Sequence, residues 1–373
     1  MGVSIKPVNT RSGIRRFVDF PHRLYDSHPY WVPPLRRSEI QTFLHDANPA
    51  FDHCDVQLWI VTKDGQMVGR IAGIVNQLEN QHKTQQWARF GWYDFEEDGS
   101  ISTMLMDQVI KWARSKGCTK IKGPYGFSNM DKAGMLTFGF NELPTMAESY
   151  NHPYYPEQME TMGFEKLVDY KSFEATVPEA LSDRVIKFAD LVAARYGLYT
   201  VPFRSRRDVG RVGHEVFSLL NVAYADLESY VPHTQRQISL IVSQYQSLVN
   251  PDFLSVIRDG SDRIVAFGIT MPSISKALQG CRGRLFPFGF FQLRSAMYRN
   301  DRADLIFIGV HPDYKNKGLT AIIFKHIINT YIRYGIKKAE TNPEMESNQQ
   351  VQNLWKDYEM RQHKRRRCYQ QQI

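Results

Sequence analysis

The same order of predicted elements occurs twice along this 373-residue chain, and this repeat constrains the fold more than any other feature. In the first half, alternating apolar strands at 56–62 and 67–75 flank a Lys63-Asp-Gly65 turn, which is typical of a hairpin. The elements predicted after this hairpin are a strand at 89–95, a helix at 102–116, a strand at 120–123, a helix near 156–162 and a strand near 168–175.

The second half repeats this order. Strands at 253–257 and 263–270 flank an Asp259-Gly260 turn and again predict a hairpin. The other predicted elements are helices at 182–195, 212–225 and 234–249 before the hairpin, then a strand at 305–310, a helix at 321–334, a strand at 337–340 and a helix at 349–358. We therefore predict an α/β protein, with an α+β mixed sheet in each of two units packed side by side. A boundary near Pro178 would give domains 1–178 and 179–373.

A short basic turn joins a buried strand to an amphipathic helix in the second half. It reads V-H-P-D-Y-K-N-K-G-L-T-A from Val310 to Ala321. A strand, turn and helix in this order aim the helix N-terminus and several backbone N–H groups at one point, as in phosphate sites. Lys315 and Lys317 add positive charge, and Gly318 lets a ligand approach the backbone closely. The turn predicts a pyrophosphate site; the alternative is an ordinary turn with solvated lysines.

The two commonest phosphate-binding motifs are absent from the sequence. No G-x-x-x-x-G-K-S/T occurs, so a P-loop NTPase is not supported. No G-x-G-x-x-G occurs between a strand and a helix, so a Rossmann dinucleotide site is not supported either.

The basic turn instead resembles the coenzyme A loop of the GNAT superfamily of acyl-CoA N-acyltransferases. That loop reads V-x-P-x-x-R/Q-x-x-G-x-G/A after the fourth strand of the fold, and Val310, Pro312 and Gly318 match it. Lys315 stands where Arg or Gln is usual, and Thr320 places a branched side chain where Gly or Ala is usual. The resemblance is firmest over 253–358 and weaker over 56–175. It implies a tandem GNAT arrangement with a degenerate N-terminal copy.

The resemblance also implies that acetyl-CoA or another acyl-CoA binds the C-terminal half. The residues expected to contact it are Ile308, Gly309, Val310, Pro312, Tyr314, Lys315, Asn316, Lys317, Gly318, Leu319, Thr320 and Asn348. In this chemistry a backbone N–H of the fourth strand, here from Ile308 to Val310, polarises the thioester carbonyl. Asn348 matches the first residue of the family signature N-x-x-A/V-x-x-L-Y-x-x-x-G-F/Y, and that Asn helps to hold the pantetheine arm.

N-acylation requires a base that removes a proton from the attacking amine. Glu340, at the end of a predicted inner strand, is the first candidate, although it could instead form a surface pair with a neighbouring lysine. His311, after the fourth strand, is the second candidate, although a lone His in a turn is usually solvated. Trp355 occupies the signature's Tyr position, the usual acid to the leaving thiolate, and Tyr358 lies i+3 from it as a possible substitute.

The matching turn of the first half is acidic. Asp94-Phe-Glu-Glu-Asp-Gly-Ser100 carries four carboxylates, which would repel a pyrophosphate. The first half is therefore expected to lack coenzyme binding and to shape the acceptor site. Its carboxylates either attract a cationic amine or form a solvated turn, in which Asp98 or Ser100 is a helix N-cap candidate.

Two other segments keep alternatives open. Lys364-Arg-Arg-Arg367 reads as a solvated tail or as a contact for the adenosine phosphate, an anionic acceptor or RNA. Phe286-Pro-Phe-Gly-Phe-Phe291 reads as a lid, an apolar pocket or a surface buried against the other half.

Composition adds broad limits. The net charge of +8 and pI near 9.1 favour anionic partners, although aromatic interleaving typical of RNA readers is missing and we do not expect nucleic-acid binding. The four scattered cysteines form no C-x-x-C pair, and we expect no metal site. No signal peptide and no apolar run of about 18 residues occurs, so a cytoplasmic location without a transmembrane segment is expected.

The sequence as a whole predicts an N-acyltransferase that moves an acyl group from acyl-CoA to an unidentified amine. The alternatives are a non-catalytic GNAT-fold scaffold, an aminoacyl-tRNA-dependent enzyme, and a lipid-directed acyltransferase that uses long acyl chains.

Overall fold

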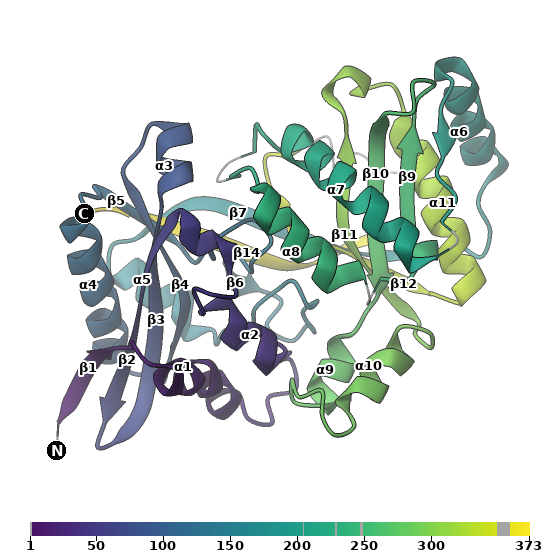
Figure 1. Ribbon diagram of the computed structural model, residues 1–373. Coiled ribbons are helices and arrows are strands. Elements are labelled where there is room, and N and C mark those ends of the chain that lie inside the picture. The colour runs from purple at the N-terminus through teal and green to yellow at the C-terminus, as the bar shows by residue number, and fades with distance from the viewer. Residues whose placement is uncertain (1, 204, 228–229, 247–248, 349–358) are drawn as a thin grey trace.

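A single mixed sheet runs through the protein (Figure 1). The computed structural model describes residues 2–203, 205–227, 230–246, 249–348 and 359–373. These residues form a 14-stranded sheet in the order β1-β2-β3-β4-β5-β14-β7-β12-β11-β10-β9-β8, with β13 paired to β7 and β6 paired to β14. The predicted mixed α/β fold with two similar units is confirmed.

Seven strands lie before residue 178. They are β1 (Val3–Pro7), β2 (Cys54–Lys63), β3 (Gln66–Asn76), β4 (Trp87–Phe95), β5 (Lys120–Gly123), β6 (Met135–Phe138) and β7 (Glu165–Thr176). The strands after it are β8 (Tyr199–Thr200), β9 (Leu254–Arg258), β10 (Ile264–Pro272), β11 (Arg302–Val310), β12 (Lys338–Thr341), β13 (Glu344–Met345) and β14 (Met360–Gln372). In each half a hairpin precedes a parallel pair, β4 with β5 and β11 with β12.

The two halves exchange their last strands. β7, from the first half, pairs with β12 of the second, while β14, at the C-terminus, pairs with β5 of the first. β7 and β14 then pair with each other along the middle of the sheet, and the C-terminus lies beside β5 (Figure 1). Each half therefore completes its sheet with a strand of the other. The boundary near Pro178 stays a prediction, because the sheet is continuous across it.

The interpretation of Lys364-Arg-Arg-Arg367 as a solvated tail is wrong, because these residues lie inside β14. Lys364 and Arg366 are fully buried, and Arg367 pairs with Asp169 on β7 at 2.8 Å. Lysine and arginine side chains are usually exposed, which is why the sequence favours a tail here. Burial of these cations in a sheet requires carboxylates buried beside them. The helix predicted at 349–358 lies outside the described residues.

Helices cover both faces of each half of the sheet (Figure 1). The helices of the first half are α1 (Arg11–Leu24), α2 (Arg36–Thr42), α3 (Gln77–Lys83), α4 (Gly99–Ser115) and α5 (Tyr154–Thr161). Those of the second are α6 (Asp183–Tyr196), α7 (Arg206–Ala223), α8 (Gln235–Gln246), α9 (Ser275–Gly280), α10 (Gly289–Ala296) and α11 (Leu319–Tyr334). No described helix is long and apolar enough to cross a membrane.

Neighbouring strand residues enter different cores because side chains alternate across a strand. On β2, Trp59 packs in the core that contains α4, whereas Ile60 packs in the core that contains α1. On β9, Ile257 faces the core with α6 and α11, and Val256 faces the core with α7 and α8. Both sheet faces are buried, which explains why these strands read as nearly continuous apolar runs.

The two hairpin turns differ. Asp64 and Gly65 both have positive φ (52° and 82°), as the predicted two-residue turn requires. The second turn is longer than predicted and runs from Asp259 to Arg263, with positive φ at Asp262 instead of Gly260. The Asp259 carboxylate accepts the N–H groups of Ser261 and Arg263 and so closes this turn.

Candidate functional site

The parallel strands β11 and β12 part half-way along β11. They pair from Arg302 to Leu305, and there β12 ends. Asn342 follows β12; its backbone N–H donates to the Leu305 carbonyl (3.0 Å), and its side-chain amide donates to the Ile306 carbonyl (2.9 Å). Further along β11, the Tyr224 hydroxyl donates to the Ile308 carbonyl at 3.0 Å. The last third of β11 therefore presents a backbone edge to side chains and open space.

The predicted pyrophosphate turn contains a short 3₁₀ helix, η3 (Pro312–Tyr314), before α11. Gly318 occupies the N-cap position of α11 with φ of +81°, and no described side chain caps this helix end. A Cβ at Gly318 would also lie 3.1 Å from the ring of Phe188 on α6. Glycine is therefore required here by conformation and by space, and the N–H groups of the first helical turn have no side-chain acceptor.

Aromatic and polar contacts hold the turn in place. The Tyr314 hydroxyl donates to Asp259 at 3.1 Å, which ties the turn to the β9–β10 hairpin. The Lys317 ammonium lies 4.9 Å from the Tyr314 ring and 5.4 Å from the Tyr196 ring, in range for cation–π attraction. Lys315 lies 3.9 Å from the exposed Asp226 carboxylate, a pairing that contributes little.

One large cavity of about 980 Å³ connects this turn with the first half of the chain. Its volume is at the upper end of ordinary ligand sites. The predicted coenzyme residues that line it are Ile308, Gly309, Val310, Tyr314, Lys315, Asn316, Gly318, Leu319, Thr320 and Asn348. Pro312 and Lys317 are not among the lining residues. The structure thus brings ten of the twelve predicted coenzyme residues to one cavity.

The polar group around Asp94, on the cavity wall contributed by the first half, is internally paired. Asp94, at the end of β4, accepts from Arg70 (2.7 Å) and from the Tyr25 hydroxyl (3.1 Å). The Tyr25 hydroxyl also lies 3.0 Å from that of Tyr155, and burial raises the pKa of both phenols. Asp94 is thus neutralised by Arg70, and it is the one carboxylate of the acidic turn that lines the cavity in the described structure.

The rest of the acidic turn is a surface feature. Asp98 caps α4 by accepting from the Ser100 N–H at 3.0 Å and pairs with Lys63 at 3.2 Å. Glu96 pairs with Arg23 at 3.0 Å, and both side chains are about half exposed. The Asp98 cap is confirmed, whereas attraction of a cationic amine by this turn stays a prediction.

Sequence reasoning missed Glu344 and Tyr224, which both line the cavity. Glu344 lies on β13, which pairs with β7. Burial raises the pKa of Tyr224 to about 12, and the charge of Glu344 adds to that effect. Neither residue belongs to a motif. Only the pairing of β13 with a strand from the other half brings Glu344 to this place.

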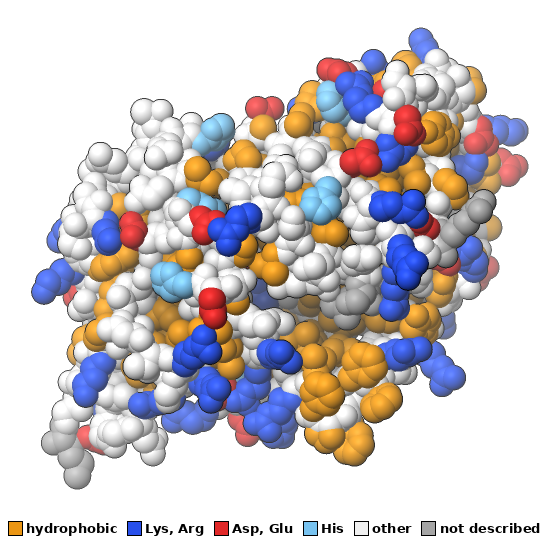
Figure 2. Space-filling view, in the orientation of Figure 1, with side chains coloured by type: hydrophobic (Ala, Val, Ile, Leu, Met, Phe, Trp, Pro, Cys, Tyr) orange, Lys and Arg blue, Asp and Glu red, His pale blue; other side chains and the backbone are white. Residues whose placement is uncertain are grey.

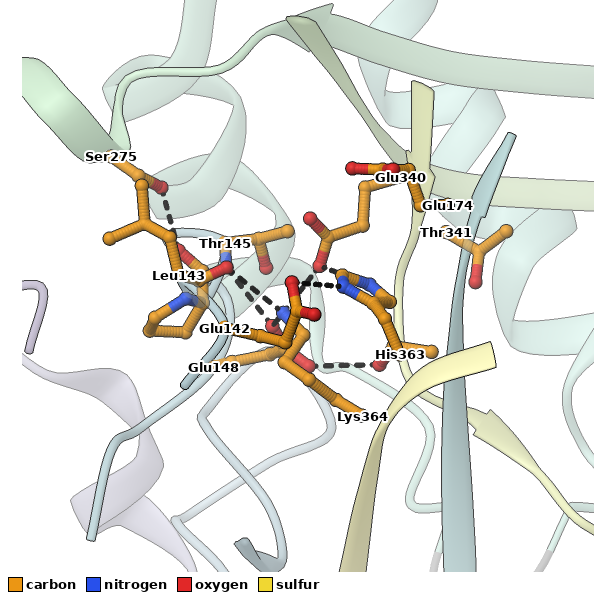
Figure 3. A network of polar contacts seen from close by, with 12 residues as sticks. Glu142, Leu143, Thr145, Glu148, Glu174, Ser275, Glu340, Thr341, His363 and Lys364 are labelled. Carbon is orange, nitrogen blue, oxygen red and sulfur yellow. Dashed lines mark hydrogen bonds and ion pairs between the residues drawn. The ribbon is translucent and has the colours of Figure 1, made fainter. Parts of the chain in front are cut away.

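Glu340 lies in a buried ionic cluster (Figure 3). Its carboxylate contacts Lys364 and lies 3.3 Å from the Nε2 atom of His363, both on β14. Lys364 also contacts Glu148, and the Nδ1 atom of His363 lies 3.4 Å from Glu142. Glu340 is therefore not the lysine surface pair considered above, and it does not line the cavity. Its role as a base stays a prediction.

His311, the second predicted base, is not brought to the cavity. His311 serves the turn, where its Nδ1 atom accepts from the Asp313 N–H at 3.2 Å, and it is not a lining residue. Tyr358 lies outside the described residues. In the described part of the chain, no group of three or more His, Cys, Asp or Glu is placed to hold a metal ion.

The protein has the GNAT fold in a tandem arrangement. A solved structure described as a tandem GNAT protein from the clavulanic acid biosynthesis pathway aligns over 100% of this chain and 98% of its own, with a TM-score of 0.56 and 12% identity. No family model matches the sequence.

Two curated relatives extend the likeness. Protein YghO of Escherichia coli (strain K12) is 26% identical over 374 residues, 97% of this chain and 94% of that protein. The bacterial ceramide synthase of Caulobacter vibrioides (strain NA1000 / CB15N) is 27% identical over 301 residues, 78% of this chain and 75% of that protein.

Proposed function

We propose that this protein is an N-acyltransferase that moves an acyl group from acyl-CoA to an amine inside the cavity. One observation carries the proposal: the same cavity of about 980 Å³ is lined by the free edge of β11, by the uncapped N-terminus of α11 and by the first half of the chain. A donor bound on the β11–α11 side would thus meet an acceptor that enters along the other wall.

The residues of the second half fit an acyl-CoA. The N–H groups at the start of α11, with Lys315 beside them, suit the pyrophosphate. The carbonyl of Ile308 points to the edge where β12 has ended, and the N–H of a strand residue points to the same edge as its carbonyl. The Ile308 N–H is therefore suited to polarise the acyl oxygen. The acyl-CoA itself supplies the activated thioester carbonyl.

Proton handling is assigned to two cavity residues. Glu344, which lines the cavity, accepts a proton from the acceptor amine as the new C–N bond forms. Tyr224 keeps its proton at neutral pH, because burial raises its pKa to about 12. Its hydroxyl leaves the Ile308 carbonyl and donates to the sulfur as the C–S bond breaks, and the proton that Glu344 took from the amine then returns to Tyr224. Glu340, His311 and Tyr358 remain the alternatives that the sequence offers for these roles.

A lipid-directed form of the same reaction is the second candidate. The relative named bacterial ceramide synthase favours it, since a ceramide is an N-acylated long-chain amine. Apolar side chains at the far end of the cavity, among them Trp31, Val32, Met146 and Met271, suit an alkyl chain. Long-chain acyl-CoA and long-chain amines are therefore the substrates of this second candidate.

The test combines binding with turnover. Calorimetry with acetyl-CoA and palmitoyl-CoA is expected to show binding to the wild-type protein and none to Gly318→Glu. Gly335→Glu is the matched control, because Gly335 ends the same helix with φ of +71° and nothing lies within 4 Å of its Cβ position. Release of free thiol in the presence of sphinganine, but not of small amines, would support the lipid-directed form.

Two results would contradict the proposal. Equal binding to Gly318→Glu and Gly335→Glu would place the coenzyme elsewhere. Absence of binding at millimolar acyl-CoA would favour the non-catalytic scaffold, or the aminoacyl-tRNA-dependent enzyme if the protein then bound charged tRNA in a salt-dependent way.

A further inference from the structure

A group of aromatic side chains projects from the segment that joins β10 to β11. Phe286, Phe288 and Phe291 have exposed fractions of 79%, 71% and 65%, and Phe290 and Tyr298 are about half exposed. Five of the eleven exposed large hydrophobic side chains in the described structure thus lie within residues 286–298. Figure 2 shows the corresponding hydrophobic group at the lower right, over the lobe formed by α9 and α10. We call this group the aromatic patch.

The patch is not a loosely packed loop. Beneath it, Leu278 on α9 and Leu293 on α10 are buried together with Met271 and Val32 in one apolar cluster. The Gly283 carbonyl accepts from the Arg36 N–H at 3.0 Å, which ties the lobe to α2. The fold therefore holds the lobe in place while its aromatic side chains remain in water, at a cost that a monomeric soluble protein usually avoids.

The charge around the patch has one sign. Residues 273–300 contain five lysines or arginines and no aspartate or glutamate. The five cations, all exposed, are Lys276, Arg282, Arg284, Arg294 and Arg299. Lysine and arginine side chains also surround the hydrophobic group in Figure 2. The lobe thus combines protruding aromatics with five exposed cations and no carboxylate of its own.

We propose that the aromatic patch is a membrane-docking surface that binds anionic phospholipid bilayers. Aromatic rings partition into the interfacial layer, and lysine and arginine are attracted to anionic headgroups, so this combination is the one that peripheral membrane proteins use. In Figure 2 the hydrophobic group protrudes at the lower edge of the molecule, which favours a bilayer over a folded partner. The proposal does not depend on acyl transfer.

The patch also lies beside the cavity. Val32 and Met271 belong to the apolar cluster under the lobe, and both line the cavity. Docking would therefore hold this end of the cavity close to the lipid surface.

The test is flotation with lipid vesicles. The 373-residue protein is expected to float with vesicles of phosphatidylcholine that contain about 30% phosphatidylglycerol. Its binding to vesicles of pure phosphatidylcholine should be weaker by about tenfold or more. Raising the salt from about 50 mM to about 500 mM is expected to weaken the binding, because the headgroup attraction is screened.

Two variants separate the aromatic and charged contributions. Phe288→Ser with Phe291→Ser should abolish flotation, whereas its control, Leu191→Ser with Phe138→Ser, should not, because those side chains are similarly exposed (64% and 54%) outside the lobe. Arg294→Glu with Arg299→Glu should weaken binding to anionic vesicles about tenfold or more. The equal charge change Lys111→Glu with Arg114→Glu, on the exposed face of α4, should leave it unchanged.

Three results would overturn the proposal. The first is absence of flotation with anionic vesicles at low salt. The second is flotation that the Phe288 and Phe291 changes leave intact. The third is self-association in light scattering that these changes abolish without any vesicle binding, which would make the patch an interface between two copies of the chain.

Discussion

Replacing Lys364 by methionine should destabilise the protein by about 3–5 kcal/mol, the usual cost of removing one partner from a buried ion pair. Lys364 on β14 contacts Glu148 and Glu340, and its side chain is fully buried. Burial alone lowers the pKa of Lys364, but the two carboxylates outweigh it and hold that pKa above its ordinary value. Methionine fills similar space without the charge. The loss of stability therefore reports the cost of leaving two buried carboxylates without their cation.

The measurement is urea unfolding at pH 7, followed by far-UV circular dichroism. With a slope of about 3 kcal/mol per molar urea, the midpoint should fall by about 1 M or more. The matched control is Lys338→Met on β12, whose side chain is 40% exposed and lies 3.7 Å from Glu174, and it should cost less than about 1 kcal/mol. Adding Glu340→Gln to Lys364→Met should recover part of the loss. A cost for Lys364→Met no larger than for the control would refute the buried network as a source of stability.

Three more predictions follow from single contacts. Burial, followed by the charge of Glu340, raises the pKa of Asp304 to about 8, so the folded state holds a proton there that the unfolded state releases near pH 4. This group should therefore lower the free energy of unfolding by at most about 1.4 kcal/mol for each pH unit between pH 4 and 8. Thermal unfolding at several pH values should show a shallower fall in stability for Asp304→Asn than for the wild-type protein. Parallel stability curves for the two proteins would contradict this. Asp98→Ala should cost about 1 kcal/mol in urea unfolding through loss of the α4 N-cap, while Asp98→Asn should cost less. Gly318→Ala should cost about 1 kcal/mol or more, because φ is +81° and Phe188 lies 3.1 Å from the new Cβ, and a neutral result would show that the turn relaxes freely.

Local sequence patterns predicted most elements of both halves. The Asp64-Gly65 turn needs only two residues that tolerate positive φ, and the apolar spacing of α11 is visible in sixteen consecutive residues. The predicted pyrophosphate turn was equally visible, because strand, turn and helix are contiguous in the chain. Ten residues chosen from it and from its surroundings line one cavity.

The predictions that failed or stayed open involve contacts between distant segments. Lys364 read as part of a tail because nothing near it in the sequence shows that Glu148 and Glu340 meet it inside the sheet. Glu344 was not predicted as a site residue, because its place on the cavity wall depends on the pairing of β13 with β7. The aromatic patch was expected to be buried or to close a pocket, and only the packing of α9 and α10 decides that its rings face water.

The sequence by itself determined the repeated order of elements, the two hairpins and the glycine turn at α11, since each depends on residues close together in the chain. Tertiary structure alone decided the exchange of β7 and β14 and the burial of Lys364 and Arg366 within the sheet. It also decided that both halves would share one cavity. The reason is physical: the cost of burying a charge or exposing a ring depends on what lies across the sheet, and that partner comes from tens to hundreds of residues away.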